Sequence, residues 1–209
     1  MRQLIRIGGT LLVAAGLLTL LWVLVVWRWE DPFTAIYTHV QQSRLAATYG
    51  QRLTGFRSVD AAAYRRSLEP GDPVGRLKIP RIGLNMIVVQ GTDPSDLERG
   101  PGHYIPSGLP GDGHLVYVAG HRTTFLAPFA NIDKIRIGDP VQFSLPYGTY
   151  TYRVTRHYVV SKNDLAVLRD HGTEVLRLQA CHPRFFATHR YIVDATLASF
   201  TPPVKSTSS

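Results

Sequence analysis

Cysteine is almost absent from this chain, since Cys181 is the only one among 209 residues. A single cysteine excludes an internal disulfide framework and any metal site built from several thiolates. The sequence also has no acidic cluster of the kind that binds calcium. We therefore expect no metal and no cofactor, and the lone thiol is either a small packed apolar residue or a reactive group.

Positive charge is abundant but not clustered. The formal net charge is +8, yet the basic residues are scattered along the chain and form no single run. Scattered basic residues argue against a nucleic-acid partner. Two interpretations stay open, namely an anionic membrane or envelope surface as partner, or a basic soluble face with no such partner.

Charge is missing altogether from residues 8–27. Twenty helical residues span about 30 Å, the thickness of a bilayer's hydrocarbon core, and the three tryptophans of the chain lie near the C-terminal end of this run. The run is longer than the apolar core of a cleaved secretory signal, so we expect an uncleaved transmembrane signal anchor at 8–27. Two arginines precede it, which predicts a cytoplasmic N-terminus at 1–7 and an extracytoplasmic remainder.

The rest of the chain divides at changes of composition. Residues 28–70 are polar to amphipathic with Ala-rich pieces, which predicts a partly helical juxtamembrane stalk. The dense turn signal at 69–73 marks the boundary of a domain at 71–200. Residues 201–209 are rich in Pro, Ser and Thr, which is typical of a disordered tail.

Short β-like runs with turns between them dominate residues 71–200. The strand candidates are 75–80, 84–89, 115–121, 141–145, 150–154 with its continuation 158–161, the run that ends at Cys181, and 190–197. Short helices are expected at 93–100, 127–135 and 163–169, and loops at 100–104 and 109–113. Many short strands and few helices predict a mainly β domain, closed as a barrel or packed as a sandwich.

The strand that carries the cysteine has an apolar side and a polar side. The apolar side consists of Leu176, Leu178 and Ala180, and the polar side of Arg177, Gln179 and Cys181. Pro183 cannot donate to the sheet and should end the strand. The thiol is therefore predicted at the open end of a strand on its wetter side, where a nucleophile could sit.

A cysteine nucleophile needs a histidine that favours the thiolate. His121 has the best local context of the eight histidines, because it ends a buried strand and follows Gly120, which permits close backbone approach. His182 is adjacent to Cys181 but points to the opposite face in an extended chain, which favours a structural role.

A nucleophile that attacks a carbonyl also needs donors for the oxyanion. Arg190 begins the last strand nine residues after Cys181, a spacing that fits a strand, a loop and a returning strand. An ordinary arginine paired at a strand end is the alternative, and Arg122, Arg177 and Arg184 compete for the same role.

Several motifs in collinear order resemble those of the sortases. They are the Ala-Gly-His-Arg-Thr-Thr run at 119–124, the Cys-His-Pro-Arg-Phe run at 181–185, Arg190 before Tyr-Ile-Val, and the matching segments at 97–104 and 109–111. The resemblance covers about residues 73 to 200 and is most similar to class E. The N-terminal anchor fits the same family.

This resemblance implies an eight-stranded β-barrel cysteine transpeptidase that joins secreted proteins to the cell envelope. Cys181 is then the nucleophile, His121 the acid and base, and Arg190 the group that holds the oxyanion. The substrate is a C-terminal LPxTG-like motif, typically LAxTG-like in class E, and the acceptor is an amine on a peptidoglycan precursor. Tyr104 falls in the loop that the family links to motif preference, and Ala180 and His182, which flank the cysteine, complete the candidate substrate contacts.

The sequence departs from the family in one place, because the cysteine motif is usually Thr-Leu-x-Thr-Cys. Arg177 and Ala180 stand where those threonines are expected. Two alternatives therefore stay beside the transpeptidase, namely a membrane-tethered cysteine peptidase that only hydrolyses and a non-catalytic β domain that binds envelope proteins. A thioester must be shielded from water during transfer, and the loops at 100–110 and 161–172 are candidates for that shield.

Overall fold

The computed structural model describes residues 2–29, 32–55 and 61–203. Its α-helices are α1 (Arg2–Trp29), α2 (Pro32–Gly55), α3 (Ala61–Arg66) and α4 (Pro94–Leu97), and its 3₁₀ helices are η1 (Pro80–Ile82), η2 (Ile132–Lys134) and η3 (Leu165–Leu168). Its strands are β1 (Pro73–Ile79), β2 (Leu84–Gln90), β3 (Gly102–His103), β4 (Leu115–Ala119), β5 (Pro140–Leu145), β6 (Gly148–Ser161), β7 (Val175–His182) and β8 (His189–Thr201).

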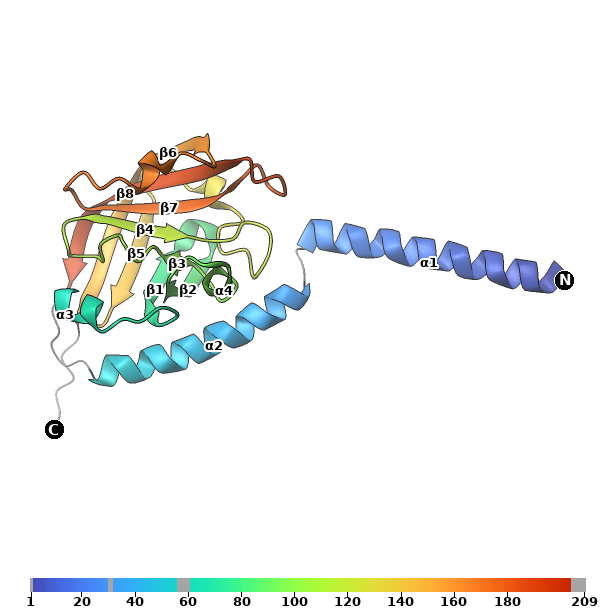
Figure 1. The fold of residues 1–209 in the computed structure, drawn as a ribbon, viewed down its shortest axis with the longest axis horizontal. Coiled ribbons are helices and arrows are strands. Elements are labelled where there is room, and N and C mark those ends of the chain that lie inside the picture. The colour runs from blue at the N-terminus through green and yellow to red at the C-terminus, as the bar shows by residue number, and fades with distance from the viewer. Residues whose placement is uncertain (1, 30–31, 56–60, 204–209) are drawn as a thin grey trace.

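Eight strands close into one barrel in the order β1-β2-β3-β4-β7-β8-β6-β5 (Figure 1). The β2–β3 and β4–β7 pairs are parallel, and the remaining pairs are antiparallel. This confirms the predicted eight-stranded barrel with short helices. Alternation explains the hairpin of β5 and β6, because every second residue of β5 is buried and points into the barrel.

Three local expectations differ from the structure. The expected loop at 100–104 contains β3, which pairs with both β2 and β4. A Cβ at Gly102 would lie 2.2 Å from the Gly91 carbonyl oxygen, so only glycine permits this close pairing. The expected helix at 127–135 is reduced to η2, and the positive φ of Ala127 is incompatible with a right-handed helix that begins there. The strand expected at 115–121 ends at Ala119.

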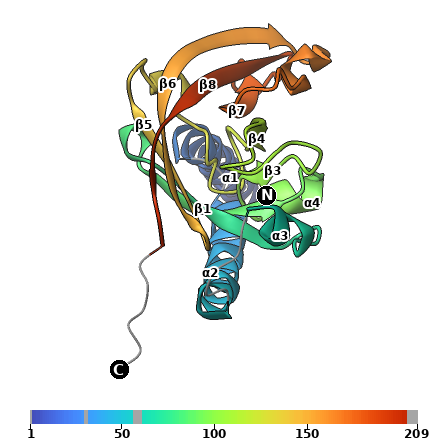
Figure 2. The ribbon, with the colours of Figure 1, turned by 90° about the vertical axis from the view of Figure 1, so that its left-hand side faces the viewer.

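Helix α2 lies along the outside of the barrel, opposite the side formed by β6, β7 and β8 (Figures 1 and 2). Leu45 and Tyr49 pack there with Ile87 and Val89 of β2. Gln42 donates to the carbonyls of Ile87 and Arg99 and accepts from the Ile87 amide. The segment expected to be a stalk therefore includes a helix that packs against the barrel.

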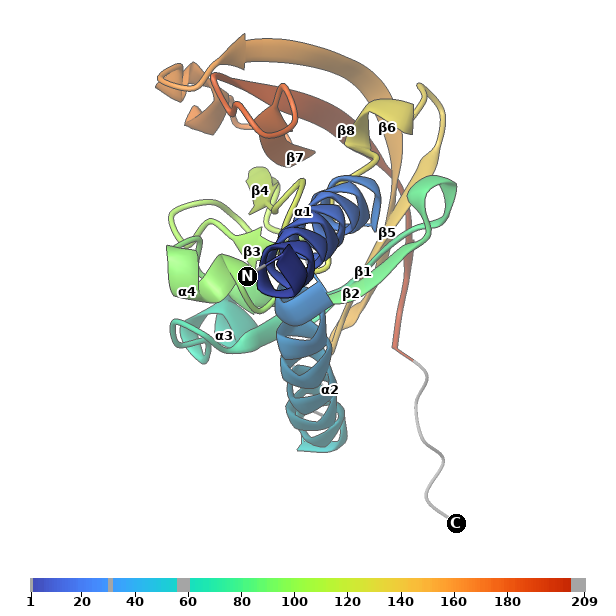
Figure 3. The same cartoon turned by 90° about the vertical axis from the view of Figure 1, so that its right-hand side faces the viewer.

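Helix α1 projects away from the barrel (Figure 1), and Figure 3 looks along this helix. Within the described part of the chain it is the one helix that is long and apolar enough to cross a membrane, over Arg2–Val25, and none of that apolar window is buried. Its length and exposure are compatible with single-pass anchoring. The loop after β4 lies at the end of the barrel beside the first turns of α2 (Figure 1).

Candidate active site

Cys181 and Arg190 are direct neighbours, because they pair across the antiparallel strands β7 and β8. Paired residues point to the same face of a sheet. The nine-residue spacing therefore produces the predicted strand, loop and returning strand. Cys181 is a free, half-buried cysteine.

His121 reaches the same end of the barrel along β4. This strand runs parallel to β7, with Ala119 beside Gln179 as their last paired residues. The Gly120 amide continues the contact by donating to the Gln179 carbonyl over 3.0 Å. The chain therefore enters His121 at the level where β7 reaches Cys181, so the three predicted catalytic residues come from one end of three adjacent strands.

The alternation predicted for β7 is confirmed. Leu176, Leu178 and Ala180 belong to the core inside the barrel. Arg177, Gln179 and Cys181 occupy the other face. That face carries a second apolar cluster that includes Tyr117, Val167 and Ile192, and β7 ends at His182, directly before Pro183.

The His121 imidazole is enclosed without being fully satisfied. Its ring lies 5.2 Å from the ring of Phe125, and its buried Nε2 atom has no hydrogen-bond partner. Burial lowers the pKa of His121, and the nearby carboxylate of Glu98 opposes this with a smaller effect. The structure therefore favours a neutral imidazole whose Nε2 has no partner within the protein.

Arg190 has few partners. Its Nη1 atom donates to the carbonyls of Ala187 and His189, at 3.0 and 2.9 Å. No carboxylate of the described residues forms an ion pair with it. Its remaining donors are available to a ligand.

On the face of β7 that carries Cys181, which we call the groove face, lies a cavity of about 250 Å³ that is lined by Arg190 but not by Cys181 or His121. We call it the groove cavity. Tyr104, Tyr117, Gln179 and Arg190 line one side of it, and residues of η3 line another. The Tyr117 hydroxyl donates to the Gln179 side chain. The cavity offers apolar surface with a few polar groups, as peptide-binding sites require.

The three predicted substrate contacts have different surroundings. Tyr104 lines the groove cavity and packs edge-on against Tyr117, with ring centroids 5.9 Å apart. Ala180 is 2% exposed and packs in the barrel core, so its side chain faces away from the cavity. His182 lies beside Arg122, with 2.9 Å between Nη1 and Nδ1.

Arg122, which the sequence offers only as an alternative to Arg190, joins the segments that carry His121 and Cys181. Its guanidinium contacts the Cys181 carbonyl at 3.3 Å as well as His182, and forms an ion pair with Asp133 at 3.0 Å. Arg122 directly follows His121, so it ties the histidine loop to the end of β7. Its adjacency to His121 was the only sequence signal for this role.

Comparisons with known proteins find a family model and relatives that match most of the barrel. The model of the Sortase domain matches residues 77–198. Sortase D of Bacillus subtilis is 34% identical over 170 residues, which cover 78% of this chain and 84% of that protein. Sortase SrtE1 of Streptomyces coelicolor is 26% identical over 222 residues, 96% of this chain and 59% of that protein. The solved structure of sortase E from Streptomyces avermitilis has a TM-score of 0.59 and 32% identity, covering 68% of this chain and 97% of that one.

Proposed function

The chain belongs to the sortase family of cysteine transpeptidases, and we propose that it cleaves a C-terminal LAxTG- or LPxTG-like sorting motif through a thioester on Cys181. The cleavage removes the C-terminal tail of the substrate protein, and the rest of that protein is then transferred to an amino group of a cell-wall precursor. The observation that carries this proposal is the shared strand end of Cys181, Arg190 and His121, with a buried His121 Nε2 that lacks a partner.

In the first half-reaction, the Cys181 thiol gives its proton to His121, and the thiolate attacks the carbonyl carbon of the threonine that precedes the glycine of the motif. Negative charge develops on the carbonyl oxygen, and the unpaired donors of Arg190 hold it. His121, as imidazolium, gives its proton to the departing glycine amine. The carbon–nitrogen bond breaks and a thioester on Cys181 remains.

In the second half-reaction, the amine of the acceptor attacks the thioester. His121 is now neutral and takes a proton from the attacking nitrogen, which restores the imidazolium. The carbon–sulfur bond breaks and a new amide forms. The lowered pKa of His121 suits this step because the neutral base is the form that burial favours.

The groove cavity is the binding site that we assign to the motif. Tyr104 lines it and is the substrate contact with the strongest support. His182 directly follows Cys181 in β7 and is held by Arg122. Ala180 offers the motif only its backbone because its side chain is in the core.

Residues 8–27 anchor the chain in the membrane with residues 1–7 in the cytoplasm, and residues 71–200 act outside it. The apolar helix α1 supports the membrane span, and the two arginines before residue 8 support the orientation. The partners of the domain at 71–200 are then secreted proteins with a sorting motif and an amine of the peptidoglycan precursor. Both occur on the outer side of the membrane.

The test uses the full chain in detergent micelles, because α2 packs on the barrel and its removal would disturb β2. The protein is incubated with LAxTG-like or LPxTG-like peptides, with and without an acceptor amine. We expect mass spectrometry to find an acyl adduct on Cys181 and an amide product when the amine is present. Cys181→Ala should form neither product. The proposal would be overturned if the parent protein formed no adduct with either peptide.

The same assay separates the two alternatives. A peptidase that only hydrolyses would form the adduct but release the free acid at every amine concentration. A non-catalytic binding domain would retain peptide without any adduct, in the parent and in Cys181→Ala alike.

A further inference from the structure

Arg177 occupies one of the two positions at which this chain departs from the cysteine motif of its family, and its surroundings are unusual for an exposed face of a barrel. Its side chain is only 7% exposed. It lies on the same face of β7 as Cys181, four residues earlier. We infer that Arg177 is a positioning residue that clamps η3 in place as a wall of the groove cavity.

The clamp has three points of contact. The Nε and Nη2 atoms of Arg177 donate to the two carboxylate oxygens of Asp194, at 2.6 and 2.9 Å. The Nη1 atom donates to the Val167 carbonyl at 2.6 Å. This bidentate pair fixes the plane of the guanidinium, so its third donor is directed at η3.

Asp194 is itself held from the far side. It pairs with Arg177 across β7 and β8 and with Arg156 across β8 and β6, and Arg156 Nε lies 2.9 Å from Oδ2. Tyr158 donates to the same oxygen over 3.4 Å. The carboxylate therefore keeps cationic and hydroxyl partners when Arg177 is replaced.

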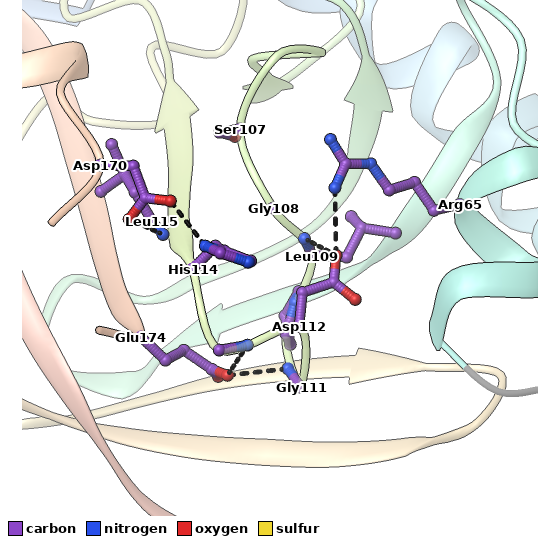
Figure 4. Close-up of polar contacts among 12 residues, drawn as sticks. Arg65, Ser107, Gly108, Leu109, Gly111, Asp112, His114, Leu115, Asp170 and Glu174 are labelled. Atoms are coloured by element: carbon purple, nitrogen blue, oxygen red, sulfur yellow. Dashed lines mark hydrogen bonds and ion pairs between the residues drawn. The ribbon is translucent and has the colours of Figure 1, made fainter. Parts of the chain in front are cut away.

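Val167 is the middle of a long connection between β6 and β7. Among the described residues, its bond to Arg177 is the one hydrogen bond that joins η3 to the barrel strands. The C-terminal part of the connection is fixed separately, as Figure 4 shows. There Asp170 bonds His114 and the Leu115 amide, and Glu174 accepts from the amides of Gly111 and Gly113.

These contacts divide the connection into two parts with different restraints. Apolar packing of Val167 with Tyr117 and Ile192 holds η3 against the groove face, but apolar contacts do not fix the register or rotation of η3. The hydrogen bond from Arg177 to the Val167 carbonyl fixes both. Leu165, Val167 and Leu168 all line the groove cavity, so a shift of η3 changes the shape of the site that receives the peptide.

The inference rests on the proposed peptide substrate. Its effect can be measured separately from catalysis, because Arg177 touches neither the thiol nor the His121 ring. Its loss should weaken peptide binding while the chemistry at Cys181 continues. The variants are Arg177→Met, which loses all donors, and Arg177→Lys, which keeps the charge but loses the planar fork that bonds Asp194 through two nitrogens. Arg153→Met is the matched control, since Arg153 donates to the Gly138 carbonyl on an exposed face.

The measurements use the full chain. For Arg177→Met we expect KM for the sorting peptide to rise about tenfold with kcat within about twofold. The dissociation constant of the peptide should rise equally in the Cys181→Ala background. Alkylation of Cys181 by iodoacetamide should keep its rate, and amide hydrogen exchange should accelerate at 165–169 but not in β5. Arg177→Lys should lie between, and Arg153→Met should match the parent.

A KM within twofold of the parent, or exchange at 165–169 that does not change, would overturn the clamp. If Arg177→Met does not fold, Arg177→Lys decides by the same readouts. A failed proposed function looks different, because the parent would then form no adduct on Cys181 while the exchange experiment would still report on η3.

Discussion

Arg177 and Arg190 are two arginines on adjacent strands and on the same face of the barrel, yet their surroundings are opposite. Arg177 is almost fully buried and bonds a carboxylate and a carbonyl. Arg190 bonds only carbonyls of its own loop and lines the groove cavity. A guanidinium whose N–H groups are all hydrogen-bonded within the protein has a structural role. One with unpaired N–H groups can donate to an oxyanion and stabilise its negative charge.

The same contrast separates two histidines. His103 is completely buried, and both ring nitrogens have partners, Gln90 on one side and Gly108 with Ser107 on the other. His121 is also enclosed, but its Nε2 has none. Buried polar groups are normally bonded, and an exception points to a role in chemistry. Partnered groups should therefore affect stability and unpartnered ones activity.

The largest effect is expected at Arg190. Arg190→Met should lower kcat/KM for the sorting peptide about 10²- to 10³-fold, because the oxyanion loses its donor. The melting temperature should stay within about 2 °C, since Arg190 bonds only carbonyls of its own loop and solvent can replace it there. Arg190→Lys keeps the charge without the fork and should recover part of the rate. A large loss of stability with normal kcat/KM would reverse the contrast with Arg177.

The placement of these arginines shows what the sequence could predict. Alternation along 176–181 and the proline at 183 were enough to place Cys181 on the groove face and end the strand. The nine residues to Arg190 were enough to predict their pairing, because a short loop permits a single antiparallel return.

Other features depend on contacts between distant residues. The parallel pairing of β4 with β7 joins residues 60 positions apart, such as Leu115 and Val175, and no local pattern records it. Arg177 appears in the sequence only as a departure from a motif, because its partners Asp194 and Val167 come from other segments. The packing of α2 on β2 also needs tertiary structure to be seen.

A second prediction concerns stability at acidic pH. Burial lowers the pKa of His103 to about 4, although its bond to the Gly108 carbonyl opposes this. Since the unfolded histidine titrates near 6.5, protons bind the unfolded chain first, and stability present above pH 6.5 is lost as the pH falls. The contribution is about 3 kcal/mol between pH 7 and pH 4.

Urea unfolding at a series of pH values measures this effect. His103→Gln should flatten the loss of stability between pH 7 and pH 4, even though its stability at pH 7 is lower. His171→Gln, at an exposed position, is the control and should leave the slope unchanged. An unchanged slope in His103→Gln would assign the acid sensitivity to other groups.

A third prediction breaks the contrast by giving Arg190 a carboxylate. Val160 pairs with Arg190 across β6 and β8 and packs on the groove side. Val160→Asp should occupy the guanidinium with a cross-strand ion pair and lower kcat/KM about fivefold relative to Val160→Asn. The difference should shrink in 1 M salt because the pair is partly exposed and screened. Equal rates for the two variants at low salt would show that an open fork on Arg190 is not required.

The smallest effect is expected at Phe125. Its substitution tests whether burial alone sets the pKa of His121. The Phe125 ring lies against the imidazole, and burial is the main cause of the lowered pKa. Phe125→Ala admits water, so the pKa of His121 should rise toward its ordinary value and the imidazolium should persist to higher pH. Phe125→Leu keeps apolar cover and should change it less.

Titration of ¹³C-labelled histidine by NMR measures this pKa directly, with His121→Gln to identify the signal. The pKa of the partnered His103 should not move in Phe125→Ala, because its environment is set by Gln90, Ser107 and Gly108. A His121 pKa that falls or stays constant in Phe125→Ala would mean that a partner, and not enclosure, controls the unpartnered histidine. In that case the difference between the two histidines would no longer explain why only one of them is suited to proton transfer.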